Sequence, residues 1–474
     1  MRFGLWAVVV ALVIAQVVTG MATPEASPDS DERKPYLSHG ARFVTTIPSD
    51  WVPDRTLAHD YAGESGFIAS GSLFSSWGMP DPYRTLDEAC DEIAERYGGE
   101  PRAVMVAEMP ACRVEPASAG NDAPVGVVIT HPQPRGDQEF VVVVANRGSL
   151  DVILNSLSFD VSSVTPWVYF DVALDLISVR SLQRDLIDWE RIRSEAHLAM
   201  AATSPEGDFG AAQMLLRAVM QDIRSVGGDG HNHFLSADEA RAVRAGVTSP
   251  SQATLPTVMP NEPAPGLVKV IVPRFASTDE AGRRYVESLW LHQEAAIDET
   301  TCGIVVDLSS NSGGNMYPML QGLGPLLGEG PLLGFIDAAG NELQVTMNDR
   351  YQLAENGITN TVYTPERPVP DLGERSLAIA VVIGPMTASA GEATAIGLLA
   401  ADFPVRLFGE TTSGFATSGD GFPLMDGAMV LLSGHWTTTV DGQTFPQGIA
   451  PDVEVDGWNL PGVIEEWIRE TTGC

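Results

Sequence analysis

Three continuous apolar runs restrict the folds open to the second half of the chain. They are "LVKVIV" at 267–272, "CGIVVDL" at 302–308 and "LAIAVVI" at 377–383. Helical patterns separate them, at 279–297 and 315–327. Strands buried on both faces read as uninterrupted apolar runs, and helices alternating with such strands cover both faces of a sheet. The sequence therefore predicts an α/β fold with a mixed sheet, in which a meander of shorter strands follows at 405–455.

The chain is strongly acidic. Its 474 residues include 28 lysines and arginines against 62 aspartates and glutamates, which gives a formal net charge of −34. Such a surface repels phosphate backbones and anionic lipid, so we expect no nucleic-acid partner. The length and the hydrophobic content of 44% allow two or three domains with cores of their own.

The N-terminus has the three-part layout of a secretory signal. Arg2 precedes the apolar run "LWAVVVALVIAQVV", and small residues follow at Gly20 and Ala22. We expect a signal peptide at 1–22 and a disordered leader at 23–39, with an uncleaved anchor as the alternative. No later stretch reaches the about 18 apolar residues of a spanning helix. We therefore expect no integral membrane span after signal cleavage, and a secreted, periplasmic or otherwise extracytoplasmic protein.

Four cysteines fit an oxidising compartment, and their spacing matches no zinc pattern. We expect Cys90 to pair with Cys112, because a helix and a following strand of one domain could bring them together. Cys302 would then pair with Cys474. The alternative is that the cysteines are free, buried thiols.

The chain divides into an accessory part, a helical part and a core. Residues 40–165 carry an amphipathic helix at 85–99 among strand-like runs and assemble no nucleophile or metal site. We expect an accessory α+β domain there, and its order of elements resembles small modules of the Mog1 type. Residues 181–233 are expected to form a helical region, because apolar residues recur every three to four positions as far as Val226. A Pro- and Ser-rich connector leads to a core domain at 262–474.

Ser389 lies in the segment "MTASAGEA", between an apolar strand and a helix. Small neighbours leave its hydroxyl room, and the start of the helix aims backbone N–H groups at this corner, where they can hold a developing oxyanion. Ser389 also precedes Glu392 by three residues, which is the spacing of a capping box. On this stretch alone the serine is either a nucleophile or a helix cap.

Two further segments place small and polar residues beside apolar elements. In "VVDLSSNSGGN", Gly313 and Gly314 let the backbone approach a ligand, although a simple glycine turn would also explain them. In "GGDGHNHF", either His231 or His233 could serve as a general base near neutral pH. The two histidines could also form a metal pair, but no third ligand has a recognisable spacing, so we expect no metal.

These segments, in this order, resemble the C-terminal processing (tail-specific) serine protease family. "GIVVDLSSNSGG" is similar to the family's "DLRxNxGG", with Ser309 where arginine is usual, and "TASAGEA" is similar to its nucleophile segment "TASAxE". The following strands, through "GIAPD", are similar as well. The resemblance implies a mixed-sheet core of the ClpP/crotonase-like type with a helical cap, and Ser389 as the catalytic serine. It also implies oxyanion donors at Gly313 or Gly314 and at Ala390.

One departure selects the branch of the family. Many members activate the serine with a lysine in a "GxxTxGK" segment, whereas here the segment is "GETTSGF", and Phe415 cannot accept a proton. The chain resembles the histidine-using branch, which includes the tricorn core peptidase and the nisin-resistance protease. His231, directly after "DG", matches that branch's base. Lysine-type members usually carry a PDZ domain, for which the about 35 residues between Phe234 and Val268 are too few.

The sequence does not decide which group is the third catalytic residue, the one that orients the histidine. In tricorn an acidic residue near the terminal "GIxPD" supports the site, but "TFPQGIAPD" has no carboxylate before Gly448. Gln447, Asp229 or a backbone carbonyl could orient the histidine. Glu392, three residues into its helix, is expected to cap that helix or brace the loop.

The sequence thus predicts an exported serine peptidase that needs no metal or organic cofactor. His231 would take the Ser389 proton, Ser389 would attack a peptide carbonyl, and water would release the acyl-enzyme. The partners would be extended or unfolded polypeptides and C-terminal segments, because a serine under a capped cleft cannot reach folded surfaces. The alternatives are a binding protein on the same fold, as in the interphotoreceptor retinoid-binding protein, and a serine esterase.

Overall fold

The structure is a computed structural model. It describes residues 33–39, 42–49, 52–53, 67–69, 72–80, 85–115, 124–135, 138–201, 209–247, 255–276, 279–348, 352–355, 358–359, 376–455 and 457–474. The expected signal peptide at 1–22 lies outside these residues. The expectation of a disordered leader over 23–39 is wrong at its end, because strand β1 (Arg33–Ser38) buries Tyr36 and Leu37. No helix of the described residues is both long and apolar enough to cross a membrane.

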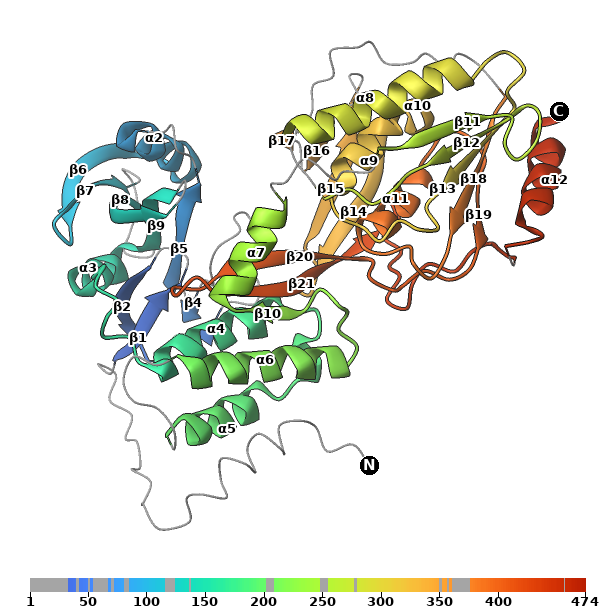
Figure 1. Cartoon of the computed structure of the whole chain (residues 1–474). Coiled ribbons are helices and arrows are strands. Elements are labelled where there is room, and N and C mark those ends of the chain that lie inside the picture. Colours follow the sequence, from blue (N-terminus) through green and yellow to red (C-terminus); the bar gives the residue numbers. More distant parts are fainter. Residues whose placement is uncertain are drawn as a thin grey trace. The chain divides into compact units, whose positions relative to one another are not determined.

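The chain forms two compact units, whose elements are labelled in Figure 1. The first unit contains residues 1–240 and 420–432, and the second contains residues 241–419 and 433–474. The accessory elements and the helical region, expected as separate domains, both belong to the first unit. A short stretch from late in the chain, 420–432, joins them there.

The accessory part of the first unit is an antiparallel sheet. Its described strands have the spatial order β3-β4-β5-β9-β8-β7-β6. Their bounds are β3 (Val52–Pro53), β4 (Phe67–Ala69), β5 (Ser72–Pro80), β6 (Glu100–Val106), β7 (Met109–Glu115), β8 (Pro124–Arg135) and β9 (Gln138–Asn146). Strand β1 pairs with β2 (Phe43–Pro48) in a separate ribbon, and helix α3 (Arg147–Ser156) follows β9.

Helix α2 (Leu86–Tyr97) lies where the amphipathic pattern at 85–99 predicts it. Thr85 caps its first turn together with Glu88, and its apolar face packs on the sheet beneath it. Cys90 of this helix forms a disulfide with Cys112 of β7, which confirms the expected pairing. The disulfide fixes the helix to the strand that follows it.

The helical region begins earlier than the sequence predicts. Its helices are α4 (Pro166–Arg180), the short 3-10 helix η1 (Arg184–Leu186), α5 (Trp189–Ala201) and α6 (Gly210–Ser225). Helix α7 (Ala237–Val247) follows and crosses the boundary between the two units. The sequence misses helix α4, before residue 181, because most of its residues are buried and its apolar residues are spread around the helix, so the pattern has no clear period of three to four residues. Strand β10 (His233–Leu235) follows α6 and pairs with the first residues of β21 (Met429–Thr438).

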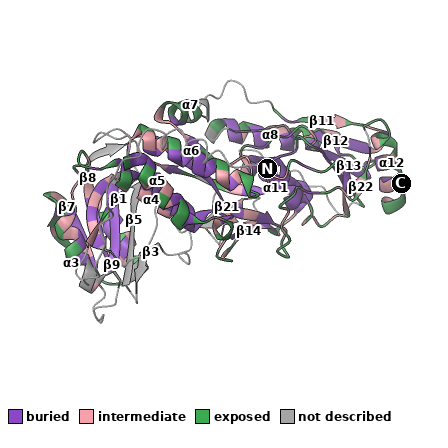
Figure 2. Ribbon diagram, turned by 90° about the horizontal axis from the view of Figure 1, so that it is seen from below, coloured by how far each residue is buried: buried purple, intermediate pink, exposed green. Residues whose placement is uncertain are grey.

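The second unit is built on the predicted sheet. Its strand order is β11-β12-β13-β18-β19-β22, with β11 antiparallel and the rest parallel. Their bounds are β11 (Thr257–Pro260), β12 (Leu267–Ile271), β13 (Gly303–Asp307), β18 (Ala378–Ile383), β19 (Val405–Gly409) and β22 (Val453–Glu454). The three apolar runs are therefore β12, β13 and β18, and β12 and β13 are largely purple in Figure 2.

Helices cover both faces of this sheet, as the apolar runs predict. One face packs on helices α8 (Asp279–Ala296), α9 (Met316–Gly322), α10 (Gly324–Leu327) and α11 (Ala390–Leu398). The other face packs on α12 (Leu460–Thr472) through Ile464 and Ile468. A disulfide joins Cys302 beside β13 to Cys474 after α12, which confirms the second expected pair.

The predicted meander at 405–455 is only partly correct. Strand β19 belongs to the parallel sheet, and only β20 (Thr417–Pro423) and β21 form a hairpin. The C-terminal part of β21 pairs with β14 (Gly330–Asp337), in a second sheet that the sequence does not reveal. The other strands of that sheet are β15 (Glu342–Met347), β16 (Leu353–Glu355) and β17 (Ile358–Thr359).

Candidate active site

Ser389 occupies a strained corner between β18 and α11. Its φ of 55° and ψ of −120° lie outside the regions that residues with a Cβ ordinarily adopt. The loop before it is fixed by Thr387, whose hydroxyl donates to the Leu308 carbonyl at 2.8 Å and accepts from the Gly384 N–H at 3.0 Å. Strain of this kind persists only where surrounding structure imposes it, and it clusters at functional sites.

Glu392 reaches back from the first turn of α11 to this corner. The Ser389 N–H donates to Glu392 Oε2 at 2.9 Å, which is the bond from N-cap to N3 residue in a capping box. The cap reading of the sequence therefore describes a real contact. It does not exclude a nucleophile, because in the other half of the box the Ser389 oxygen only accepts from the Glu392 N–H, and the hydroxyl keeps its own proton for a base to take.

The Glu392 carboxylate also holds the loop at 412–415. It accepts from the Thr412 hydroxyl, from the Gly414 N–H at 3.0 Å and from the Phe415 N–H at 2.8 Å. The side chain is fully buried, and burial raises the pKa of the Glu392 carboxyl while these hydrogen bonds oppose the rise. One carboxylate thus joins the serine corner to the loop where lysine-type members carry their base.

The glycine turn lies directly against Ser389. A Cβ at Gly313, where φ is 95°, would stand 2.7 Å from the Ser389 Cβ and 2.8 Å from the Ala388 carbonyl oxygen. At Gly314, where φ is 122°, a Cβ would stand 2.0 Å from the Phe275 carbonyl oxygen. Both positions therefore require glycine, for conformation and for space.

Backbone donors are present at this corner. The Gly313 N–H is engaged, since it donates to Asn311 Oδ1 at 2.9 Å. The N–H groups of Gly314 and Ala390 have no hydrogen-bond partner within the described part of the chain. Ala390 is the first residue of α11, so its N–H lies at the positive end of the helix. Of the expected oxyanion donors, Gly314 and Ala390 have the more suitable backbone groups.

Asn311 is a site residue that the sequence reasoning missed. Its side chain is fully buried, donates to the Val272 carbonyl at 3.0 Å and accepts from Gly313, while its own carbonyl accepts from the Ala388 N–H at 3.0 Å. It therefore fixes the glycine turn and the serine loop together. The sequence feature that could have identified Asn311 is its position two residues before the glycine pair.

Ser309, at the position where the family usually has arginine, binds the aspartate at the end of strand β13. Its N–H and hydroxyl donate to Asp307 Oδ1 at 3.0 and 2.6 Å, and Lys269 lies 2.7 Å from Oδ2. Burial would raise the pKa of Asp307, but the hydrogen bonds from Lys269 and Ser309 outweigh burial and lower it. This ion pair stabilises the end of β13, from which the glycine turn departs.

His231 belongs to the first unit and is oriented by Asp229. The His231 N–H donates to Asp229 Oδ1 at 2.9 Å, and its Nδ1 lies 3.3 Å from Oδ2. Only 7% of the Asp229 side chain is exposed, against 28% for His231. A carboxylate on Nδ1 leaves Nε2 of the ring to accept a proton. Of the groups left open as the orienting residue, Asp229 makes this contact, whereas the exposed Gln447 side chain makes no hydrogen bond to a described residue.

His233 has different surroundings. Its Nδ1 accepts from the Arg224 guanidinium at 3.0 Å, and burial together with this neighbouring cation lowers the pKa of the ring. His231 has the carboxylate partner that a general base uses, and His233 has a cation instead. Within the described ranges, no group of three or more His, Cys, Asp or Glu side chains is arranged to hold a metal ion.

Comparison with known proteins identifies relatives of the second half of the chain. Residues 272–455 match the family model described as Peptidase family S41. The nisin-resistance protein of Lactococcus lactis subsp. lactis is 27% identical over 203 residues, which is 42% of this chain and 58% of that protein. The chain therefore matches somewhat more than half the length of this curated relative.

Two solved structures are similar to parts of this chain. A lipoprotein from Streptococcus agalactiae is 22% identical in a match that covers 65% of this chain and 97% of that one, with a TM-score of 0.50. The photosystem II D1 C-terminal processing protease is 14% identical over 65% and 98% of the two chains, with a TM-score of 0.43.

A serine at a strained strand-to-helix corner, carried by a mixed sheet between helices, is typical of serine hydrolases. The family match is narrower. Over residues 272–455, the part of the chain that carries Ser389, it is similar to the serine-type peptidases of Peptidase family S41. The resemblance to the tail-specific protease family is thereby confirmed.

Proposed function

We propose that the protein is an exported serine peptidase that cleaves extended or unfolded polypeptides, with Ser389 as nucleophile and His231 as base. The observation that carries the proposal is the strained Ser389 corner, packed against Gly313 and flanked by the unengaged N–H groups of Gly314 and Ala390. A helix cap alone requires neither this backbone conformation nor a glycine pair pressed against it.

In the proposed mechanism, His231 Nε2 takes the proton of the Ser389 hydroxyl as Oγ attacks the peptide carbonyl carbon. Asp229 keeps the ring oriented and stabilises the imidazolium that forms. The N–H groups of Gly314 and Ala390 hold the oxyanion, and losing one such donor costs about 100- to 1,000-fold in rate.

The tetrahedral intermediate then breaks the carbon–nitrogen bond, and the amine leaves with the proton from His231. Water, deprotonated by the same histidine, attacks the acyl-enzyme carbonyl, and the Ser389 oxygen leaves as it recovers its proton. All protons balance within the histidine, the serine and water. None of these steps needs a group that the chain does not supply.

Export is part of the proposal. The disulfides Cys90–Cys112 and Cys302–Cys474 suit an oxidising compartment, as does the signal-like sequence at 1–22. We expect a secreted, periplasmic or other extracytoplasmic location. Fractionation of the producing cells tests this directly, since a cytoplasmic pool of the mature protein would contradict it.

The experiment that tests the activity is digestion of one polypeptide in two states. A disulfide-bonded substrate protein is offered folded, and again after reduction and carboxymethylation, to the wild type and to Ser389→Ala. We expect cleavage of the unfolded form by the wild type only. Hydrolysis of a small ester without any peptide cleavage would point to an esterase, and the absence of both would point to a binding protein.

A further inference from the structure

The turn of the β20–β21 hairpin carries an aspartate with many partners in the first unit. We call residues 424–428 the tip. Asp426 accepts from the Ala428 N–H at 3.0 Å within the tip, from the Tyr169 hydroxyl at 3.1 Å to each carboxylate oxygen, and from Gln213 Nε2 at 2.6 Å. Tyr169 is fully buried. The carboxylate therefore joins α4 and α6 to a turn that lies more than 200 residues later in the chain.

A second bond holds the same tip. The Met425 N–H donates to His39 Nδ1 at 3.4 Å, while His39 Nε2 lies 3.0 Å from the Tyr169 carbonyl oxygen. The ring of His39 is buried, and burial lowers its pKa to about 4, so it stays neutral and donates through one nitrogen only. The residue after β1 thus contributes to the same contact as α4 and α6.

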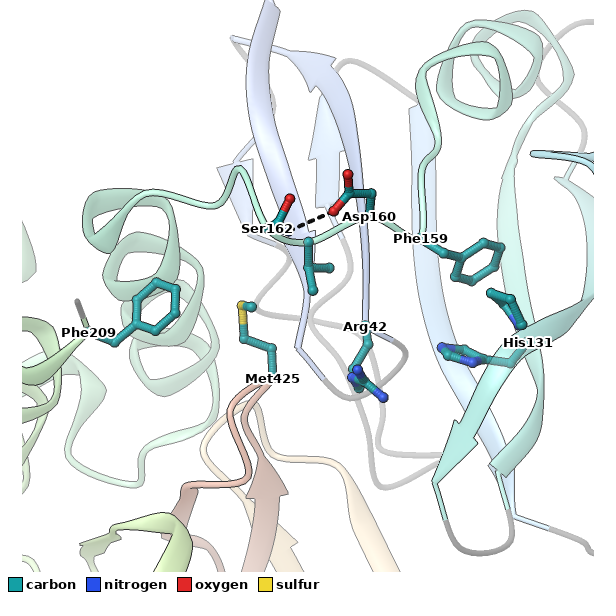
Figure 3. Close-up of a pocket in the computed structure, with 9 residues that line it drawn as sticks. Arg42, His131, Phe159, Asp160, Ser162, Phe209 and Met425 are labelled. Atoms are coloured by element: carbon teal, nitrogen blue, oxygen red, sulfur yellow. Dashed lines mark hydrogen bonds between the residues drawn. The ribbon is translucent and has the colours of Figure 1, made fainter. Parts of the chain in front are cut away.

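Packing alone does not hold the tip on every side. Met425, Phe209, Arg42 and His131 line a cavity of about 650 Å³ (Figure 3). Figure 3 shows Met425 with the Phe209 ring on one side of it and Arg42, which precedes β2, on the other. On its other sides the tip packs into the core of the first unit through Leu424 and Ala428, and the hydrogen bonds of Asp426 add a directional restraint to this packing.

Helix α6 connects the tip to the loop of His231. Gln213, near its start, binds Asp426, while Arg224, near its end, donates to the Asn232 carbonyl at 2.7 Å and to His233 Nδ1. The two residues stand about 16 Å apart along the helix, at 1.5 Å per residue. Between them, Arg217 donates to the Phe234 carbonyl at 3.2 Å. The helix therefore contacts the three residues that directly follow the base.

Strand β10 forms a second connection between the tip and the His231 loop. His233, Phe234 and Leu235 pair with Leu431, Val430 and Met429, the residues of β21 that directly follow the tip. The same hairpin begins just after Phe415, whose N–H binds Glu392. Through β21, this hairpin therefore holds the strand that follows the His231 loop.

We propose that Asp426, Tyr169 and Gln213 form a tip clamp whose members are positioning residues for His231. By holding the tip, they hold the strand that fixes the His231 loop. The inference rests on the proposed function, because it takes His231 as the base. None of the three touches the reacting atoms.

Two measurements test the clamp. The variants are Tyr169→Phe, which keeps the ring stacked on Phe209 at 4.7 Å, and Asp426→Asn. We expect faster amide hydrogen exchange in the peptide 226–236, and a fluorophosphonate labelling rate lower by about tenfold or more, since a misplacement of about 1 Å can cost about 100-fold. Asp441→Asn, in the exposed turn at the other end of β21, is the matched control and should change neither value.

A double-mutant cycle separates positioning from a merely structural role. In a His231→Ala background, Tyr169→Phe should lower the residual labelling no further, because the residue through which it acts is gone. An equal loss in both backgrounds, or unchanged exchange in 226–236, would overturn the inference. If exchange rises but the wild type is never labelled, the clamp stands as a restraint on this loop and the proposed function fails.

Discussion

Replacing Glu392 with glutamine tests how the serine corner is held. In the folded protein each carboxylate oxygen accepts two hydrogen bonds, Oε1 from Thr412 and Gly414 and Oε2 from Ser389 and Phe415. The glutamine amide presents one oxygen and one NH₂ group, and the NH₂ group cannot accept. Two of the four donors that bind Glu392 therefore lose their acceptor and face the NH₂ group instead, inside a fully buried site.

The magnitude follows from the two donors that lose their acceptor. An unsatisfied buried donor costs about 1–3 kcal/mol, so Glu392→Gln should lower the free energy of unfolding by about 2–6 kcal/mol. Removing the buried charge offsets part of this cost, because burial raises the pKa of Glu392. We therefore expect a loss in the lower half of that range, with slower labelling of Ser389 at temperatures where the variant remains folded.

Urea denaturation at pH 7, followed by tryptophan fluorescence, measures the stability, and fluorophosphonate labelling below the transition measures the nucleophile. Glu410→Gln is the matched control, because it makes the same change on an exposed side chain just after β19. A Glu392→Gln variant with the stability and labelling rate of the wild type would refute the bracing role.

Three further outcomes are expected. Gly313→Ala should nearly abolish labelling of a protein that remains folded by circular dichroism, since the added Cβ meets Ser389 at 2.7 Å; labelling at the wild-type rate would contradict the packing. His39, whose folded pKa is lowered from 6.5 to about 4, contributes stability that is present above pH 6.5 and lost as the pH falls toward 4, by at most about 3 kcal/mol. Urea midpoints at pH 7 and 4.5 should therefore differ less in His39→Asn than in the wild type. Cys474→Ser should lower the unfolding free energy by about 2–4 kcal/mol and speed exchange in α12, and no change in either would contradict the disulfide's role.

The parallel sheet could be predicted because its strands are buried on both faces. An apolar run bounded by turn residues carries its own signal, so β12, β13 and β18 lie where the sequence places them. Helix α2 was equally visible, from its cap and its apolar face. Helix α4 was not, because most of its residues are buried and its apolar residues follow no clear helical period.

The residues of the site also divide into those that the local sequence reveals and those that it does not. Ser389 and Gly313 sit in short segments whose residue types mark the chemistry, and the structure brings them into contact. The contacts of Asp426 join residues up to 257 positions apart, and nothing local in the sequence announces them. The orienting role of Asp229 depends on a loop geometry that residue types alone leave open.

The measurement that tests the central claim most directly is the rate of fluorophosphonate labelling, with the labelled residue identified by peptide mass spectrometry. The wild type, Ser389→Ala, His231→Ala and His233→Ala are compared at equal folded concentration. We expect label on Ser389 alone, none in Ser389→Ala, a large loss in His231→Ala and a small one in His233→Ala. A folded wild type that takes no label, or that is labelled equally fast without His231, would contradict the assignment of an activated serine to this corner.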